Sequence, residues 1–317
     1  MKRALLATAF VAIAGASVLV AQGIPAYQKV SGVSGSLSSV GSDTMNNMMT
    51  FWAESFRKMY PNVKVQIEGK GSGTAPPALT QGTSQIAPMS RAMNATEIDR
   101  FEAKNAYKPT QLRTSYDALA VWVHKDNPIK QLSLAQVDAV FGKGRNRGYK
   151  ENVTTWGQLG LTGEWANRPI SLYGRNSASG TYGFFKEHVL KNGDYKDTVK
   201  EQPGSASVVQ GVTEDRYGIG YSGIGYKTSG VRAVPLSETP TGAGIEGNET
   251  TVKNGTYPLW RFLYIYVNKA PGKPLDPIVG EFVKLIFSKE GQDVVVKDGY
   301  LSLSAEQCQQ EVAKVAK

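Results

Sequence analysis

The sequence predicts an α/β protein in which the functional residues lie where strands turn into helices. Short apolar stretches of strand length alternate along the chain with segments whose apolar residues recur at helical spacing. Glycine, serine and threonine gather at several of the junctions between them. Because ligands of open α/β sheets bind at the carboxyl ends of strands, these junctions are the candidate site.

An export signal is predicted ahead of the α/β region. Lys2 and Arg3 precede an apolar run over residues 4–21, and turn-prone residues follow, which is the pattern of a secretory signal peptide. Small residues favour cleavage near Ala21, so residues 1–21 are expected to be removed. No cysteine ends this run, and no later stretch approaches the length of a membrane span. We therefore expect a soluble periplasmic protein, with an extracellular or surface location as a secondary option.

Length and charge narrow the class further. The chain has 317 residues and a single cysteine, Cys308, so its stability must come from a core that is large enough for two lobes. The formal charge is +9, and loss of Lys2 and Arg3 lowers it by two. This balance suits an anionic ligand. The basic residues are scattered, so nucleic acid is not an expected partner.

Helices are predicted from apolar stripes. Met45, Met49, Trp52, Phe56 and Met59 recur at helical spacing, with charged residues on the opposite face. We assign this stripe to the core and give it no role in ligand binding. Further helices are expected over residues 95–105, 134–141, 156–159 and 277–287, and two more begin near residues 180 and 208.

Strands are predicted from short apolar or alternating stretches. Residues 63–67 alternate apolar and polar side chains, whereas 118–123 and 259–267 are strongly apolar. The other strands are expected over residues 37–40, 85–89, 169–173, 219–226 and 231–236. Residues 239–254 are expected to form a surface loop, and the chain is expected to end in a polar tail after residue 296.

The junctions around residues 41–44, 69–74, 90–91 and 174–181 share glycine, hydroxyl side chains or arginine. In the last of them, Ser179, Gly180 and Thr181 stand at a predicted helix start. The first turn of a helix has free N–H groups and a partial positive charge, and glycine allows an oxyanion to approach them. An ordinary Ser/Thr helix cap is the alternative interpretation. The recurrence of such junctions favours an anion-binding site.

Patterns typical of catalysis are missing from the sequence. We interpret His124 and His188 as structural or solvated, and Asp117 as a carboxylate with no suggested partner. No His/Cys cluster has metal-ligand spacing, and residues 204–207 resemble a nucleophile elbow only distantly. We therefore predict no catalytic residue, no metal and no cofactor.

A tetrahedral oxyanion matches the side chains that are present. It requires many N–H and hydroxyl donors and a guanidinium that grips two oxygens. A protonated ligand also needs one acceptor, because an unpaired proton costs ~1–3 kcal/mol. Asp43 is the best-placed acceptor, with a plain helix cap as the alternative. Such a carboxylate would accept a proton from phosphate and repel a fully ionised sulfate.

Four motifs in this order resemble the periplasmic phosphate-binding proteins of high-affinity phosphate ABC transporters. They are Gly-Ser-Asp-Thr at residues 41–44, Gly-Ser-Gly-Thr at 71–74, Arg-x-x-x-Ser-Gly-Thr at 175–181, and Tyr-Pro-Leu at 257–259 followed by 264–269. The resemblance covers essentially the whole mature chain. It implies a receptor that binds inorganic phosphate and delivers it to inner-membrane ABC permease subunits. We expect it to be a monomer.

The resemblance also implies a fold and a set of site residues. The fold is the two-lobed type II periplasmic-binding-protein fold with two crossovers and a ligand cleft between the lobes. The lobes would comprise residues 34–116 with 258–317, and residues 117–257. The family's phosphate-binding positions fall on Ser42, Asp43, Thr44, Ser72, Arg175, Ser179, Gly180 and Thr181.

One position departs from the family pattern. Well-known members carry an aspartate where this chain has Ser90 and Arg91. We therefore assign the proton-accepting role to Asp43, and treat Ser90 as a donor and Arg91 as a second cation.

Three other functions remain open at this point. The first is a receptor for another oxyanion, such as sulfate or molybdate. The second is a secreted phosphatase, which lacks support from metal ligands or a nucleophile–base pair. The third is an extracellular adhesin or scaffold that reuses the fold and binds no small ligand tightly.

Overall fold

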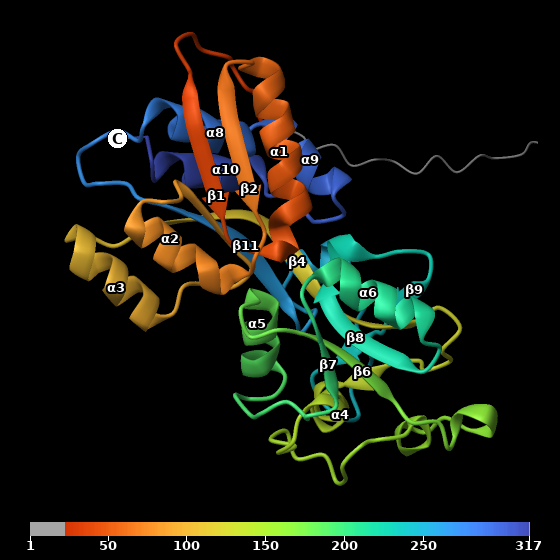
Figure 1. Ribbon diagram of the computed structural model, residues 1–317. Coiled ribbons are helices and arrows are strands. Elements are labelled where there is room, and N and C mark those ends of the chain that lie inside the picture. Colours follow the sequence, from red (N-terminus) through yellow and green to blue (C-terminus); the bar gives the residue numbers. More distant parts are fainter. Residues whose placement is uncertain (1–22, 317) are drawn as a thin grey trace, which may run out of the picture.

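The computed structural model describes residues 23–316, so the predicted signal peptide lies outside the described residues. The chain forms two α/β lobes that are connected by the long strands β4 and β11 (Figure 1). The terminal lobe, at the top of Figure 1, combines elements from both ends of the sequence, and the central lobe lies below it. The predicted α/β class and two-lobed architecture are confirmed.

The strands of both lobes join in one sheet. Its order is β2-β1-β3-β11-β4-β8-β6-β7, and β9 also pairs with β4. Its members are β1 (Gly35–Val40), β2 (Val63–Glu68), β3 (Ile86–Met89), β4 (Thr110–His124), β6 (Ser171–Arg175), β7 (Val199–Gln202), β8 (Gly218–Gly223), β9 (Val231–Ala233) and β11 (Trp260–Val267). A two-stranded sheet pairs β5 (Leu132–Ser133) with β10 (Leu236–Ser237). Because β1 pairs in parallel with β2 and β3, and β6 with β7 and β8, the carboxyl ends meet at one edge in each lobe.

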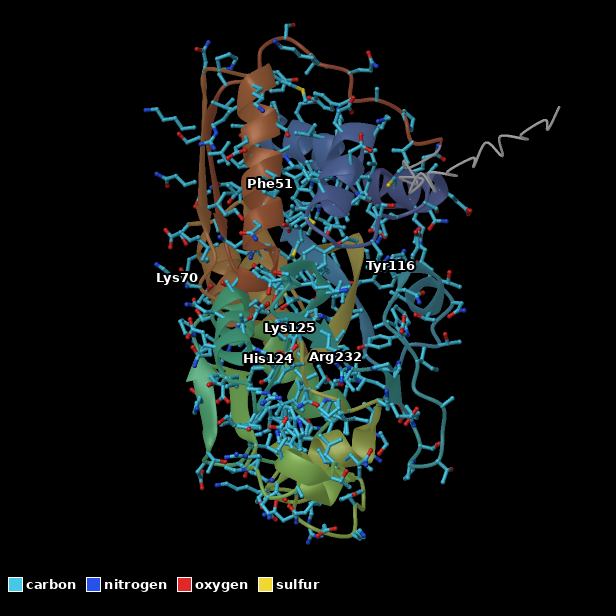
Figure 2. The ribbon with its side chains drawn as sticks, turned by 90° about the vertical axis from the view of Figure 1, so that its right-hand side faces the viewer. Phe51, Lys70, Tyr116, His124, Lys125 and Arg232 are labelled. Atoms are coloured by element: carbon cyan, nitrogen blue, oxygen red, sulfur yellow. The ribbon has the colours of Figure 1, made fainter. Side chains whose placement is uncertain are left out.

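Strand β4 serves both lobes. Up to Ala118 it pairs with β11, and from Leu119 onward it pairs with β8 and then with β9. In Figure 2, Tyr116 marks its middle part, while His124 and Arg232 lie together in the central lobe. The sequence predicted only residues 118–123 of this strand, because residues 110–117 are mostly polar. The lobe boundaries at 116/117 and 257/258 remain predictions.

Six helices cover the terminal lobe in the part of the chain that the structure describes. They are α1 (Asn46–Met59), α2 (Ala75–Gln81), α3 (Ala95–Asn105), α8 (Pro277–Ile286), α9 (Lys289–Lys297) and α10 (Ala305–Ala313). The expected polar tail is therefore wrong. Ser304 caps α10 by accepting from the Gln307 N–H at 3.2 Å, and Cys308 and Glu311 are buried on its inner face.

The central lobe has shorter helices. They are α4 (Leu134–Phe141), α5 (Gly180–His188), α6 (Ser205–Glu214) and α7 (Glu249–Lys253). The short segment Trp156–Leu159 is a 3-10 helix and not an α-helix. Helix α7 lies within the expected surface loop, where Asn248 caps it.

The predicted apolar stripe of α1 is part of the core. Met45, Met49, Trp52 and Phe56 are fully buried, and Phe56 packs edge-on against Phe282 of α8 at a ring separation of 5.3 Å. Helices from the two ends of the chain therefore share one core beneath β1. Over residues 23–316, no helix is both long and apolar enough to cross a membrane.

Candidate functional site between the lobes

Three strand ends of the terminal lobe bring serine residues together. Ser42 follows β1, Ser72 follows β2 and Ser90 follows β3, and all three are buried. The Ser90 N–H donates to Ser72 Oγ at 3.0 Å, and the two hydroxyl oxygens are 3.2 Å apart. The parallel register of these strands therefore converts a repeated sequence pattern into one hydroxyl-rich wall.

Helix α5 of the central lobe begins against this wall. Ser179 caps it, because its Oγ accepts from the N–H groups of Thr181 at 3.1 Å and Tyr182 at 3.3 Å. A Cβ on Gly180 would lie 2.3 Å from Ser72 Oγ, so only glycine permits this approach. The helix start that the sequence predicted thus faces the opposite lobe directly.

A hydroxyl pair also crosses between the lobes. Thr44 Oγ1 and Thr181 Oγ1 are 2.8 Å apart, and both threonines are buried. The Gly73 N–H donates to the Ala178 carbonyl at 2.9 Å beside them. Gly71 has φ of +114°, and a Cβ there would lie 2.5 Å from the same carbonyl. Glycine at residue 71 is therefore required by backbone geometry and by the close contact of the lobes.

Arg175 supplies a buried cation at the end of β6. Its Nη1 donates to Ser205 Oγ at 2.7 Å and its Nη2 to the Pro203 carbonyl at 3.3 Å. Among the described residues its Nε has no hydrogen-bond partner. Burial lowers the pKa of this guanidinium, and the nearby charge of Asp43 opposes that shift. A cation held this far from water favours an anion beside it.

Asp43 joins the lobes at the same point. Its Oδ2 lies 3.1 Å from Arg175 Nη2 and accepts from the Ser205 N–H at 2.8 Å. The Tyr226 hydroxyl donates to the Asp43 carbonyl oxygen at 2.8 Å. The Asp43 side chain is one-fifth exposed, so its carboxylate lies at the edge of the site. The 3-10 helix Asp43–Met45 has no side-chain cap, so Asp43 does not cap its own helix; its carboxylate instead accepts from the first N–H of α6 in the opposite lobe.

We call Ser42, Asp43, Thr44, Ser72, Ser90, Arg175, Ser179, Gly180 and Thr181 the junction cluster. In the structure, seven of them take part in contacts between the two lobes, and Ser42 and Ser179 directly precede such residues in the chain. Their ligand-binding roles remain predictions.

Arg91 is placed differently from its prediction as a second cation. Its Nη1 and Nη2 each donate to a Glu97 carboxylate oxygen at 2.7 Å. Glu97 in turn accepts from the Asn94 N–H at 2.9 Å and completes the capping box of α3. The guanidinium therefore serves the first turn of α3. It lines a pocket together with Ser179, but none of its hydrogen bonds among the described residues reaches the junction cluster.

Sequence reasoning missed a buried ion pair behind the cluster. Arg261 on β11 lies opposite Asp117 on β4, with 2.8 Å between Nε and Oδ2. Asp117 therefore has a partner, contrary to our interpretation of the sequence. The pair could have been suspected from the sequence, because a charged residue stands within or beside each strongly apolar strand: Arg261 lies within residues 259–267, and Asp117 directly precedes residues 118–123. Ser205 contacts both Arg175 and Asp43, whereas the sequence indicates it only as part of a distant resemblance to a nucleophile elbow.

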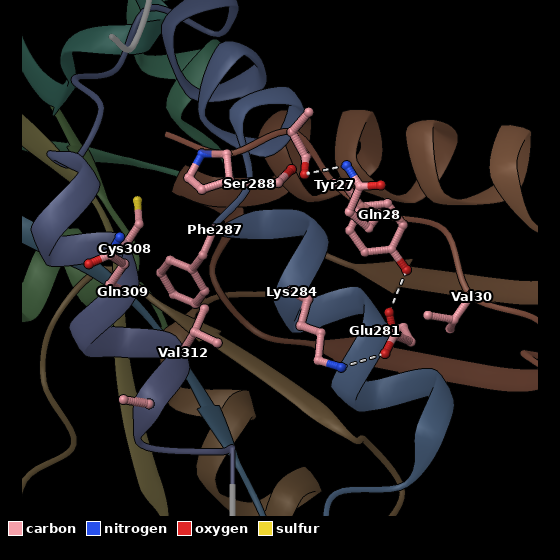
Figure 3. A pocket seen from close by; sticks show the side chains of 13 residues that line it. Tyr27, Gln28, Val30, Glu281, Lys284, Phe287, Ser288, Cys308, Gln309 and Val312 are labelled. Atoms are coloured by element: carbon pink, nitrogen blue, oxygen red, sulfur yellow. Dashed lines mark hydrogen bonds and ion pairs between the residues drawn. The ribbon is translucent and has the colours of Figure 1, made fainter. Parts of the chain in front are cut away.

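Two pockets of similar volume lie in different parts of the described residues. One, of about 620 Å³, borders the cluster and is lined from both lobes, by residues that include Ser179 of the cluster as well as Arg91 and Tyr264. The other, of about 560 Å³, lies between the N-terminal segment and helices α8 and α10 (Figure 3). There the Tyr27 hydroxyl donates to Glu281 at 2.6 Å. Within residues 23–316, no group of three His, Cys, Asp or Glu side chains is arranged to hold a metal ion.

Comparison with known proteins gives consistent matches over most of the chain. A model of the PBP superfamily domain matches residues 27–290. The phosphate-binding protein PstS of Pseudomonas aeruginosa is 58% identical over 309 residues, which cover 96% of each chain. The protein SphX of Synechococcus elongatus is 28% identical over 86% of this chain and 79% of its own.

Solved structures match in the same way. A crystal structure from Clostridium perfringens that contains bound phosphate has a TM-score of 0.71 and 25% identity, over 85% of this chain and all of the other. An ABC-type phosphate transport receptor from Vibrio cholerae has a TM-score of 0.65 and 22% identity, over 84% of this chain and all of the other, which supports the fold alone. The chain therefore belongs to the PBP superfamily and, within it, to the family of the PstS phosphate-binding proteins.

Proposed function

We propose that this protein is a substrate-binding receptor that captures inorganic phosphate at the junction cluster and delivers it to an ABC permease for import. The similarity to PstS of Pseudomonas aeruginosa, a protein named for phosphate binding, supports this proposal. The chemistry of the cluster supports it independently. Binding requires no covalent step, so the residues act only as donors, acceptors and charges.

The observation that carries the proposal is that a donor-rich helix start and a buried arginine of the central lobe both lie against the serine- and aspartate-bearing strand ends of the terminal lobe. Ser72 and Ser90 face Gly180 at the first turn of α5, and Arg175 lies at the end of the neighbouring strand β6. Hydroxyl and N–H donors with one guanidinium match the oxygens of a tetrahedral anion. Donors from both lobes would close around a single phosphate.

Asp43 supplies the acceptor that distinguishes phosphate from sulfate. Its Oδ2 is used by Arg175 and by the Ser205 N–H. We propose that Oδ1 accepts the proton of monohydrogen or dihydrogen phosphate. Sulfate has no proton at neutral pH and would meet this carboxylate unfavourably.

The lobes would act as the two sides of a clamp. We propose residues 34–116 with 258–317 as one lobe and 117–257 as the other, with β4 and β11 as the flexible connection. Separation of the lobes would expose the cluster, and closure would remove water from it and strengthen each polar contact. The closed receptor would then be the form that the permease recognises.

The cellular location is inferred from the predicted signal peptide. We propose that residues 1–21 direct export and are removed, and that the mature chain works as a monomer in the periplasm.

Isothermal titration of the mature protein with phosphate, arsenate and sulfate tests the function. We expect saturable binding of phosphate, competition by arsenate because it has the same shape and protonation, and no competition by sulfate. An exported phosphatase would instead release phosphate from an ester such as p-nitrophenyl phosphate. Tight binding of sulfate without phosphate would favour a receptor for another oxyanion, and no binding of any anion would favour an adhesin or scaffold.

A further inference from the structure

The buried pair of Arg261 and Asp117 lies where both connecting strands pass between the lobes. The two residues are directly opposite each other on β11 and β4. Asp117 Oδ2 lies 2.8 Å from Nε and 2.7 Å from Nη2 of Arg261, and the side chains are 0% and 3% exposed. Asp117 Oδ1 accepts from the Ile224 N–H at 3.1 Å. The carboxylate thus balances the charge and fixes the guanidinium.

The remaining donors of Arg261 reach both walls of the junction cluster. Its Nη1 donates to the Ser90 carbonyl at 2.8 Å in the terminal lobe. Its Nη2 donates to Thr181 Oγ1 at 3.0 Å in the central lobe. One rigid guanidinium therefore contacts the end of β3 and the first turn of α5 at once.

These contacts fix the direction of a hydrogen bond. A guanidinium can only donate, so Thr181 Oγ1 must accept from Arg261. The hydroxyl hydrogen of Thr181 is then directed elsewhere, to Thr44 Oγ1 at 2.8 Å, to Ser90 Oγ at 3.5 Å or to an anion in the cluster. The charge of Arg261 also polarises this hydroxyl and makes it a better donor.

Stability alone gives a poor account of this arrangement. A buried ion pair is often no more stabilising than apolar residues of similar volume. Here the remaining N–H donors of Arg261 bind two cluster residues, Ser90 and Thr181.

We propose that Arg261 is a positioning residue for the anion: it sets the Thr181 hydroxyl as a donor and links the two walls of the closed cluster. This role rests on the proposed function of phosphate binding. Arg175, whose Nε is unpaired among the described residues, remains the direct cationic ligand.

A double-mutant cycle tests the proposal. Arg261→Lys keeps a positive charge beside Asp117 but cannot reach Asp117, Ser90 and Thr181 together. We expect it to weaken phosphate binding about 10- to 100-fold, the range for a lost charge-assisted hydrogen bond. Thr181→Val should weaken binding too, and adding Arg261→Lys to it should change affinity by no more than about 3-fold.

Arg113→Lys is the matched control. Arg113 lies on β4, the strand that carries Asp117, and pairs with a buried acid, Glu311, at 2.6 Å; none of its hydrogen bonds or ion pairs among the described residues reaches the cluster. Its replacement should lower the melting temperature and leave phosphate affinity unchanged. If Arg261→Lys does not melt cooperatively, Asp117→Asn/Arg261→Gln, which buries no unpaired charge, takes its place in the cycle.

The outcomes separate the two claims. Wild-type affinity in the Arg261 variant, or losses that multiply in the double variant, would overturn the positioning role while the proposed function stands. A wild-type protein that binds no phosphate would overturn both. Non-additive losses with an unaffected Arg113 control would support the role of Arg261.

Discussion

Hydroxyl groups in the junction cluster have their hydrogen-bond directions set by neighbours that can only donate. Ser72 Oγ accepts from the Ser90 N–H, and Ser179 Oγ accepts from two N–H groups of α5. The hydroxyl hydrogens of both serines are therefore available to point toward an anion. This arrangement makes the cluster an array of donors before any ligand arrives, which lowers the reorganisation that binding requires.

Asp43 is the one acidic side chain of the cluster, and its replacement tests ligand selection. We expect Asp43→Asn to weaken phosphate binding about 10- to 100-fold, because an amide cannot serve as a charged acceptor for the phosphate proton. Sulfate binding should not weaken, since the repelling charge is gone. Titration calorimetry with both anions measures the two effects.

Glu68→Gln controls for the loss of one negative charge. Glu68 ends the neighbouring strand β2 and pairs with Lys70 at 2.7 Å on the surface. Its replacement should leave phosphate affinity within about 2-fold, as expected for an exposed, screened pair. Asp43→Asn with wild-type affinity would remove Asp43 from the acceptor role.

At the scale of single elements, an ion pair with the first turn of α3 determines where the Arg91 side chain lies. The Arg91–Glu97 pair and the Asn94 cap belong to the same first helical turn. We expect Arg91→Gln to lower the free energy of unfolding by about 1 kcal/mol, through loss of a half-buried ion pair. Phosphate affinity should change by less than about 3-fold.

Chemical denaturation and calorimetry measure these two quantities on the same Arg91 sample. Glu97→Gln is the matched variant, because it breaks the same pair from the other side and should also spare binding. A loss of affinity of about 10-fold or more in Arg91→Gln alone would return Arg91 to the set of ligand residues.

Asp298, which follows α9, makes stability depend on pH. Burial raises the pKa of this carboxyl to about 7, while Asn47 and the Met48 N–H at the start of α1 oppose the rise. From about pH 4 to pH 7 the folded protein therefore holds a proton that the unfolded chain has released, so stability falls as pH rises through this window. We expect Asp298→Asn to flatten this decline and to be more stable than wild type at pH 7 and above.

Thermal unfolding between pH 4 and pH 8 measures the dependence on Asp298. Asp293→Asn on α9 is the control, because the Asp293 side chain is 42% exposed and pairs with Lys289. It should keep the wild-type pH profile. An Asp298→Asn profile that is parallel to that of wild type would show that another group causes the decline.

Elements with a clear apolar period could be predicted from the sequence, and the others could not. The stripe from Met45 to Phe56 predicted α1 because packing and periodicity agree there. The first half of β4 carries polar side chains whose partners are distant: Thr114 Oγ1 donates to the Leu263 carbonyl at 3.0 Å. Helix α10 was missed because only one narrow face, around Cys308, packs inward.

At the scale of the whole molecule, the two lobes meet through contacts within the predicted site. Thr44 with Thr181, and Asp43 with Arg175 and Ser205, cross between them. Local motifs predicted these residues because strand ends and helix starts are local features. The pair of Arg261 and Asp117 is separated by 144 residues, so its contact exists only after β11 has paired with β4. The direction of the Arg91 side chain could not be predicted either, because its ion pair with Glu97 on α3 determines it.

Gly180 controls how closely the lobes can approach. An added Cβ would lie 2.3 Å from Ser72 Oγ and 2.7 Å from Ser90 Oγ, so Gly180→Ala should leave each lobe folded but hold the two apart. We expect phosphate affinity to fall by about 10-fold or more, because donors from opposite lobes can no longer reach one anion. Small-angle scattering with saturating phosphate should show a larger radius of gyration for Gly180→Ala than for wild type.

Gly280→Ala in α8 is the control for Gly180→Ala. A Cβ added at Gly280 would lie 3.8 Å from its nearest neighbour, so this variant should keep wild-type affinity and compaction. A Gly180→Ala protein that binds and compacts like wild type would show that the lobes do not need this contact to close.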